Sequence, residues 1–267
     1  MAKNNPNLSE QSIKTGLSEL VLKELDSIFI EDSTESTNDN AKNHLKRQTG
    51  LFSIHLAEQQ TSGRGRNTKK WVSPHGKNIY ISLGWKSSLN HSHLEGLSLA
   101  VATCLIAALK RFSSDELKIK WPNDLLINKK KISGILIETS DSKEGLDVVI
   151  GIGINVHMDE SEGTDIDQSW GNLEELPSNE LDRNKIIVSI VSEMHELFKE
   201  YPKSGFKNYH QVFESHNLLK DKLCKVNMDK ETLEGKVLGV NETGELLFEK
   251  NGEIQRLRYG EVSIREL

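Results

Sequence analysis

The spacing of hydrophobic residues predicts several helices, because apolar side chains recur three to four positions apart along one face of a helix. The clearest stripe covers residues 94–112 and predicts a long amphipathic helix packed on a sheet. A second strong helix is predicted over residues 183–200, and shorter ones over 38–48 and 206–216. Residues 8–30 predict one helix that runs directly into one strand.

Other stretches alternate between apolar and polar residues at every second position, which is typical of a strand. Residues 78–86 alternate apolar with small or polar positions, which predicts a half-buried strand. Residues 51–60 predict a further strand, and short strands are expected over 117–121, 132–138 and 147–155. Together these elements place the chain in the α+β class, with helices flanking a mixed central sheet.

Two segments cannot bury themselves and are predicted to be loops. Residues 62–70 contain glycine, lysine and arginine but no apolar side chain. Residues 157–167 contain five acidic side chains and no lysine or arginine, which predicts a solvated, mobile loop.

The pattern changes near residue 220. From there, short strands alternate with turns at residues 241–244 and 251–252, which predicts a small antiparallel barrel. We therefore expect three parts: an N-terminal segment with one helix (1–24), a main domain (25–219) and the barrel (220–267).

Composition and charge narrow the class of protein. The 267 residues carry 34 basic and 40 acidic side chains, a formal charge of −6, and only two cysteines, Cys104 and Cys224. Two distant cysteines cannot form a disulfide framework or a Cys-rich zinc site, and they suit a reducing cytoplasm. No signal peptide is visible, and no apolar run approaches the ~20 residues of a membrane span. The acidic balance argues against a nucleic-acid partner.

Two motifs of polar residues follow predicted strands in the first third of the chain. Ser36-Thr37-Asn38 precedes a helix, where hydroxyl groups usually only cap the helix. Gln60 is followed by Gly63-Arg64-Gly65-Arg66, in which glycines let a ligand approach the backbone and guanidiniums can neutralise carboxylate or phosphate oxygens. The segment is neither a dinucleotide fingerprint nor a P-loop, and the alternative is a surface loop with solvated charges.

Two further motifs lie near the middle of the chain. Lys120-Trp121-Pro122-Asn123-Asp124 places amide and carboxylate groups where a proline interrupts a strand, although such residues also form ordinary turns. Lys131 is followed by Gly134, and a glycine-containing strand runs through Gly151 and Gly153 to Asn155. The alternatives here are a hairpin tip and tight packing of the strand glycines.

In this order, the motifs STN, QxxGRGR, KWPND, KxxGILxE and GIGINV resemble those of the biotin–protein ligases, also called biotin–[acetyl-CoA-carboxylase] ligases. The likeness spans about residues 25–267. It implies a class II synthetase-like catalytic domain of the biotin/lipoate ligase type over residues 25–219, followed by an SH3-like barrel. One departure is that Asn67-Thr68 stand where members of the family often carry a further glycine.

The resemblance implies a reaction in two steps. The carboxylate of biotin attacks the α-phosphorus of Mg-ATP and gives biotinyl-5′-AMP and pyrophosphate. A lysine of a biotin carboxyl carrier protein, a subunit of acetyl-CoA carboxylase, then attacks the acyl carbon and expels AMP. Biotin and ATP are therefore the expected substrates, with Mg²⁺ accompanying ATP and no metal ligand assigned to the protein.

The same resemblance assigns roles to residues of this sequence. The catalytic residues that it implies are Lys131, Arg66 and Asp124. Those for biotin are Ser36, Thr37, Asn38, Gln60, Gly63, Arg64, Gly65, Arg66, Lys131 and Gly134. Those for the nucleotide are Arg66, Trp71, Asn123, Lys131 and Asn155.

Other functions stay open at this point. A lipoate–protein ligase would share the fold and the adenylation chemistry, and a biotin-sequestering module would bind biotin without releasing pyrophosphate. A biotin-responsive repressor would need an N-terminal DNA-binding domain, for which the 35 residues before Ser36 are too few unless the chain is truncated. We expect a ligase that does not bind nucleic acid or membranes and acts in the cytoplasm as a monomer or homodimer. Two loops, 62–70 and 157–170, are expected to close over the ligands, because a mixed anhydride hydrolyses where water reaches it.

Overall fold

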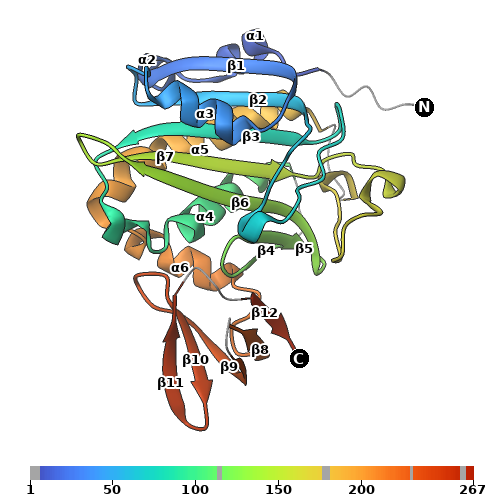
Figure 1. Ribbon diagram of the computed structural model, residues 1–267, viewed down its shortest axis with the longest axis vertical. Helices are drawn as coiled ribbons and strands as arrows, with labels where there is room; N and C mark the ends of the chain where they lie inside the picture. The colour runs from blue at the N-terminus through green and yellow to red at the C-terminus, as the bar shows by residue number, and fades with distance from the viewer. Residues whose placement is uncertain (1–6, 113–115, 176–180, 229–230, 259–262) are drawn as a thin grey trace.

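A computed structural model describes residues 7–112, 116–175, 181–228, 231–258 and 263–267. Seven strands form one mixed sheet in the order β1-β2-β3-β7-β6-β5-β4 (Figure 1). β1 pairs with β2 in parallel, and the remaining neighbours pair antiparallel. The bounds of these strands are Leu25–Thr34 (β1), Phe52–Gln60 (β2), Ile79–Ser87 (β3), Leu117–Lys120 (β4), Asp124–Ile127 (β5), Lys130–Asp141 (β6) and Leu146–Ile154 (β7).

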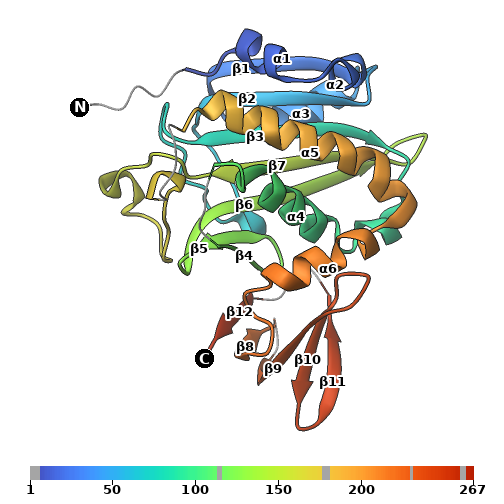
Figure 2. The same ribbon diagram turned by 180° about the vertical axis from the view of Figure 1, so that it is seen from behind.

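Helices cover both faces of this sheet. α3 (Thr37–Leu45) lies on the face shown in Figure 1, whereas α4 (Leu97–Leu109) and α5 (Arg183–Ser204) lie on the face shown in Figure 2. α6 (Lys207–His216) packs against α4 and leads toward the C-terminal strands. The mixed central sheet with flanking helices, predicted from the sequence, is therefore confirmed.

Burial of α4 differs from the prediction. The helix begins at Leu97 rather than Leu94, and twelve of its thirteen residues are buried. It is not an amphipathic surface helix, because the sheet, α5 and α6 all pack against it. A helix covered on every side has no need of a polar face.

Burial of β3 also differs. Its apolar and polar positions alternate in sequence, yet every residue from Ile79 to Trp85, the first seven of the strand, is buried. The prediction of a half-buried strand is wrong because α3 covers the second face, where the Ser82 hydroxyl meets polar groups of α3.

At the N-terminal end, two short helices replace the single predicted helix. α1 (Glu10–Gly16) and α2 (Glu19–Glu24) are separated by extended backbone at Leu17. The hydroxyl groups of Ser9 and Ser18 each accept a hydrogen bond from a backbone N–H in the first turn of the following helix. Each serine is therefore an N-cap, and two N-caps start two helices where one was predicted. β1 follows α2 directly and is longer than predicted.

The C-terminal strands form a separate antiparallel sheet, in the order β11-β10-β9-β8-β12. The predicted turn at residues 241–244 connects β9 to β10, and the one at 251–252 connects β10 to β11. The expected small SH3-like domain is confirmed. The division of the chain at residue 219 stays a prediction. The strands are Leu223–Asn227 (β8), Thr232–Val240 (β9), Leu246–Lys250 (β10), Glu253–Leu257 (β11) and Ser263–Glu266 (β12).

The two sheets meet at the KWPND motif. The indole N–H of Trp121, which is 1% exposed, donates to the carbonyl of Gly244 at 3.2 Å. Gly244 lies in the turn between β9 and β10, and a Cβ there would lie 2.6 Å from the Cα of Gly96 at the start of α4. This contact fixes the turn of the C-terminal sheet against the main sheet. None of the helices in the described ranges is both long and apolar enough to cross a bilayer.

Candidate active site

A cavity of about 400 Å³ lies where the loop 62–70 faces the start of α3 and strands β5, β6 and β7. Residues of β12 also reach its wall. This volume is typical of sites for small ligands. Most of the residues singled out in the sequence line it: Ser36, Thr37, Asn38, Gln60, Arg64, Gly65, Arg66, Trp71, Asn123, Asp124, Lys131 and Gly134.

Gly63 and Asn155 were also predicted for the site but do not line the cavity. A Cβ at Gly63 would lie 2.7 Å from the carbonyl oxygen of Trp71, so a glycine is needed there for packing of the loop. Asn155 is 4% exposed and donates its Nδ2 to the carbonyl of Gly171 at 3.2 Å. Both residues hold segments that border the cavity rather than form its surface.

Neutral polar groups form one end of the cavity, which we call the polar end: Ser36, Thr37, Asn38 and Gln60. Ser36 precedes α3 but makes no capping hydrogen bond with its side chain, so the alternative of a simple cap does not hold. The Oε1 atom of Gln60 accepts both the N–H of Thr37, at 3.0 Å, and its hydroxyl, at 3.1 Å. These contacts tie the end of β2 to the start of α3.

Asn38 is held on two sides. Its Nδ2 donates to Oε2 of Glu138 at 2.6 Å, and its Oδ1 lies 2.6 Å from the hydroxyl of Ser82. A Cβ at Gly151 would lie 2.2 Å from Oδ1, so only glycine leaves room for the amide at this point. The alternative of tight packing at Gly151 is therefore the correct one.

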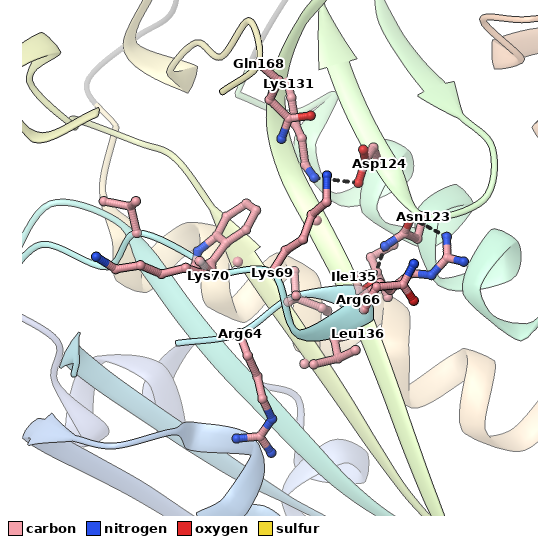
Figure 3. A pocket seen from close by; sticks show the side chains of 18 of the residues that line it. Arg64, Arg66, Lys69, Lys70, Asn123, Asp124, Lys131, Ile135, Leu136 and Gln168 are labelled. Atoms are coloured by element: carbon pink, nitrogen blue, oxygen red, sulfur yellow. Dashed lines mark hydrogen bonds and ion pairs between the residues drawn. The ribbon is translucent and has the colours of Figure 1, made fainter. Parts of the chain in front are cut away.

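The two arginines of the GRGR motif point in different directions (Figure 3). Arg64 binds Asp39 of α3 with both terminal nitrogens, at 2.7 and 2.6 Å, and lies 3.2 Å from Glu138. The paired carboxylates raise the pKa of the Arg64 guanidinium, and Arg64 lowers the pKa of Asp39. Arg66 instead lies 3.4 Å from Oδ1 of Asn123. Only Arg66 is directed toward the KWPND motif.

The loop turns sharply after Arg66. Asn67 and Thr68 have φ values of 53° and 58°, in the left-handed region that favours glycine. This is the position at which the sequence departs from the biotin–protein ligase pattern, and both arginines before it line the cavity. For the β-branched Thr68 such a conformation is a genuine outlier.

Positive charge gathers at the other end of the cavity, which we call the basic end: Lys69, Lys120, Lys131 and Arg265. The Nζ atom of Lys131 lies 2.7 Å from Oδ1 of Asp124, and both side chains are less than one-fifth exposed. Figure 3 shows Lys69 beside this pair. Burial lowers the pKa of Lys120, with Lys131 and Arg265 acting in the same direction and Asp124 opposing them. The four cations of the basic end therefore exceed the charge of Asp124, although Asp165 and Asp167 also line the cavity.

The Trp71 ring lies between the two ends, against β6 and β7. A Cβ at Gly153 would lie 2.4 Å from Cε2 of the indole, and one at Gly134 would lie 3.0 Å from Cζ3. The Lys131 ammonium is 5.4 Å from the ring centre. The indole N–H is buried and has no hydrogen-bond partner within the described part of the chain. Trp71 therefore gives the cavity an aromatic wall, whereas its indole nitrogen is buried against Gly153 of β7.

Residues 30–155 match the sequence profile of the Biotin/lipoate A/B protein ligase family. Over 211 residues the chain is 32% identical to the bifunctional ligase/repressor BirA of Escherichia coli, an alignment that covers 79% of this chain and 65% of that protein. The chain is thus similar to this family over residues 30–155, and the likeness to the E. coli protein extends over most of the chain.

Solved structures agree with this likeness. Biotin protein ligase from Aquifex aeolicus, in complex with biotin and ATP, superposes with a TM-score of 0.74 and 26% sequence identity, covering 90% of this chain and 99% of that one. The biotin–[acetyl-CoA-carboxylase] ligase of Paracoccus denitrificans is 39% identical over 128 residues, which cover 46% of this chain and 52% of that protein. The chain spans just under two thirds of the length of the E. coli protein.

Sequence analysis missed several charged residues of the site. Asp39 and Glu138 bind Arg64, and Asp165 of the acidic loop lies 3.7 Å from Lys70. Glu138 belongs to the KxxGILxE motif, so the motif itself could have indicated it. Asp39 and Arg265 carry no such signal, because only the fold brings Asp39 to Arg64 and Arg265 to the cavity wall. Within the described ranges, no three His, Cys, Asp or Glu side chains gather as metal ligands.

Proposed function

We propose that this protein is an ATP-dependent ligase that activates biotin as biotinyl-5′-AMP and transfers the biotinyl group to a lysine of a biotin carboxyl carrier protein. One observation carries the proposal: a single cavity joins a neutral polar end to a basic end that contains Lys131. A biotin molecule has the matching chemistry, a neutral ureido ring at one end and a carboxylate at the other. The likeness to a biotin protein ligase in complex with biotin and ATP supports this assignment.

The first step brings two anions together. The biotin carboxylate attacks the α-phosphorus of ATP, a P–O bond forms, and pyrophosphate leaves with the electrons of the broken bond. Lys131 and Arg66 supply positive charge where negative charge accumulates in the transition state, an effect worth about 3–4 kcal/mol for a single well-placed group. Asp124 holds Lys131 at 2.7 Å, and the remaining N–H donors of the ammonium can bind the incoming carboxylate, which then competes with Asp124 for Lys131.

The second step uses the carboxylate that the first step releases. An amine must lose a proton to attack the acyl carbon, and its unperturbed pKa is about 10.4. Once Lys131 binds the substrate, Asp124 is free to accept a hydrogen bond from the ammonium of the carrier and to take its proton as the amide forms and AMP leaves. Asp124 thus serves as a counter-ion before the reaction and as a base during transfer.

The remaining residues bind the two substrates. The polar end, with the backbone of Arg64 to Arg66 and of Gly134, meets the donors and acceptors of the ureido ring. Trp71 stacks on adenine with its aromatic ring, which lines the cavity. Asn123 and Arg66 lie next to the phosphates. Asn155 does not touch the nucleotide itself, but its hydrogen bond to the carbonyl of Gly171 positions a segment that borders the cavity. Mg²⁺ would enter with ATP, held by phosphate oxygens and water.

Two loops border the reaction chamber. Lys70 of the loop 62–70 lies 3.7 Å from Asp165 of the acidic loop, and both residues contribute to the cavity wall. Closure of these loops over the ligands would protect the mixed anhydride from water. The proposal places the protein in the cytoplasm, as a monomer or homodimer with a carrier protein as its partner and without nucleic-acid or membrane partners.

Incubation of the purified protein with biotin, Mg-ATP and a carrier domain tests the proposal. Intact-mass measurement should show one added biotinyl group on the carrier, and pyrophosphate release should depend on biotin. A parallel reaction with lipoate should show neither. Lipoyl transfer without biotinyl transfer, or tight binding of biotin without pyrophosphate release, would overturn the proposed activity.

A further inference from the structure

The Arg64 guanidinium is already neutralised inside the protein. It makes a bidentate pair with Asp39 at 2.6 and 2.7 Å, and its Nη2 lies 3.2 and 3.3 Å from the two oxygens of Glu138. Two carboxylates and one guanidinium leave a net charge of −1 at this place. A substrate carboxylate or phosphate would have to displace a bidentate ion pair to use Arg64, whereas Lys131 has a single competing carboxylate.

Glu138 connects this pair to the polar end. An ionised carboxylate only accepts hydrogen bonds, so Glu138 fixes the Asn38 amide with Nδ2 toward β6 and Oδ1 toward Ser82. Ser82 is fully buried, and Gly151 provides the space in which Oδ1 lies. Through these contacts, Arg64 of the loop, Asp39 of α3 and Glu138 of β6 form one unit, which we call the Arg64 network.

We propose that the Arg64 network positions the ring-binding polar end and does not stabilise phosphate charge. Glu138 is the central positioning residue, because it alone contacts both Arg64 and Asn38 among these side chains. The inference rests on the proposed function, since it assumes that the polar end receives the biotin ring. It assigns Arg64 and Arg66 different tasks, although the two residues stand side by side in one motif.

The network makes a specific kinetic prediction. Glu138→Ala frees the Asn38 amide to rotate and leaves the ring without one ordered partner, so the KM for biotin should rise roughly tenfold or more. The KM for ATP should stay within about twofold, because the basic end is untouched. Glu138→Gln keeps an oxygen that accepts from Asn38 and should recover most of the affinity for biotin.

Biotin-dependent exchange of pyrophosphate into ATP measures both KM values in one assay. Glu144→Ala is the matched control, because Glu144 is exposed at the far end of the β6–β7 hairpin. Thermal unfolding checks that the variants fold. Should Glu138→Ala not fold, Asp39→Asn weakens the same network from its half-exposed member and should raise the KM for biotin alone.

The outcomes separate the two proposals. A selective rise of the KM for biotin, reversed by Glu138→Gln, supports the Arg64 network as a positioning unit. Equal rises for biotin and ATP, or a Glu138→Gln variant no better than Glu138→Ala, would overturn the network while leaving the ligase activity standing. Wild-type protein without any biotin-dependent exchange would overturn the proposed function, and this inference with it.

Discussion

At the scale of single residues, Lys131 and Asp124 form a pair of opposite charges in the wall of the cavity. A hairpin tip, the alternative that the sequence leaves open for Lys131, would expose this lysine, and its loss would then hardly affect stability. In the structure its side chain is 16% exposed and is paired with Asp124, which is 19% exposed. Removal of one partner leaves a largely buried charge without compensation, which costs more than loss of a surface ion pair.

We therefore predict two effects of Lys131→Ala. Biotin-dependent pyrophosphate release should fall by roughly a hundredfold or more, and the free energy of unfolding should fall by about 1–3 kcal/mol. The double variant Lys131→Ala/Asp124→Asn removes the uncompensated carboxylate, so it should recover stability but not activity. Denaturant unfolding and a pyrophosphate assay measure the two effects, and near-normal pyrophosphate release would exclude Lys131 from the mechanism.

Two glycines under Trp71 allow a graded test of the nucleotide site. Gly153→Ala would place a Cβ 2.4 Å from the indole and must displace it, whereas Gly134→Ala, with a Cβ 3.0 Å away, needs a smaller shift. If the indole stacks on adenine, the KM for ATP should rise roughly tenfold for Gly153→Ala and less for Gly134→Ala. Steady-state kinetics at varied ATP provide the measurement. Equal effects of the two substitutions, or none on ATP, would contradict the stacking role.

Residues that stand together in a short motif could be predicted from the sequence, whereas contacts between residues far apart in the sequence could not. The lysines, arginines and amides of the cavity stand in short motifs, so their composition identifies them. Their partners do not: Arg64 meets Asp39 across 25 positions and Glu138 across 74. No local pattern shows that a guanidinium is already neutralised, because that depends on which elements the fold brings together.

At the scale of elements, periodicity located most helices and strands but misjudged their surroundings. α4 and β3 carry the expected patterns, yet both are buried on faces that the patterns leave open. Alternation in sequence reports side-chain polarity, and polar side chains such as Ser82 can be buried if another element satisfies them. β5 was not predicted, because its first residue, Asp124, stands in a motif that favours a turn and only three apolar residues follow it.

The packing of α3 on β2 creates a pH-dependent contact. His55 of β2 is 3% exposed and stacks on Phe29 with ring centres 4.8 Å apart. Burial lowers the pKa of His55 to about 4, helped by His44 and Arg47 and opposed by Asp26. The unfolded chain binds a proton near pH 6.5, whereas the folded chain does so only near pH 4, so acidification between these values favours the unfolded state.

Stability should therefore fall as the pH is lowered from about 6.5 toward 4, and His55 should account for about 2 kcal/mol of this loss by pH 5. Denaturant unfolding of wild type and His55→Gln at pH 7 and pH 5 measures it. The variant should lose less stability than wild type between the two pH values, while His91→Gln, a change at an exposed histidine, should behave as wild type. Parallel losses in wild type and His55→Gln would disprove the assignment.

At the scale of the whole molecule, the charge at one end of the cavity is opposite in sign to the net charge of the chain. The chain carries a net charge of −6, yet the cavity has a basic end, and the net negative Arg64 network lies beside the opposite, polar end. Under the proposed function, this field would orient a substrate that has one anionic end with its carboxylate toward Lys131. A dianionic molecule of similar length would place its second charge near Asp39 and Glu138, and this repulsion selects against it.

The C-terminal sheet completes the basic end. Arg265 of β12 lines the cavity, and the contact between Trp121 and Gly244 holds this sheet in place. Arg265→Ala should raise the KM for ATP up to roughly fivefold, because one cation near the polyphosphate is lost, and should leave the KM for biotin unchanged. Arg256→Ala is the matched control, since it removes an exposed arginine from β11 at the other edge of the same sheet.

The KM for ATP should also depend less on salt in Arg265→Ala than in wild type, because salt then has one fewer attraction between Arg265 and the polyphosphate to screen. A control variant that raises the KM for ATP as much as Arg265→Ala would show that the effect comes from the net charge of the molecule rather than from the placement of β12.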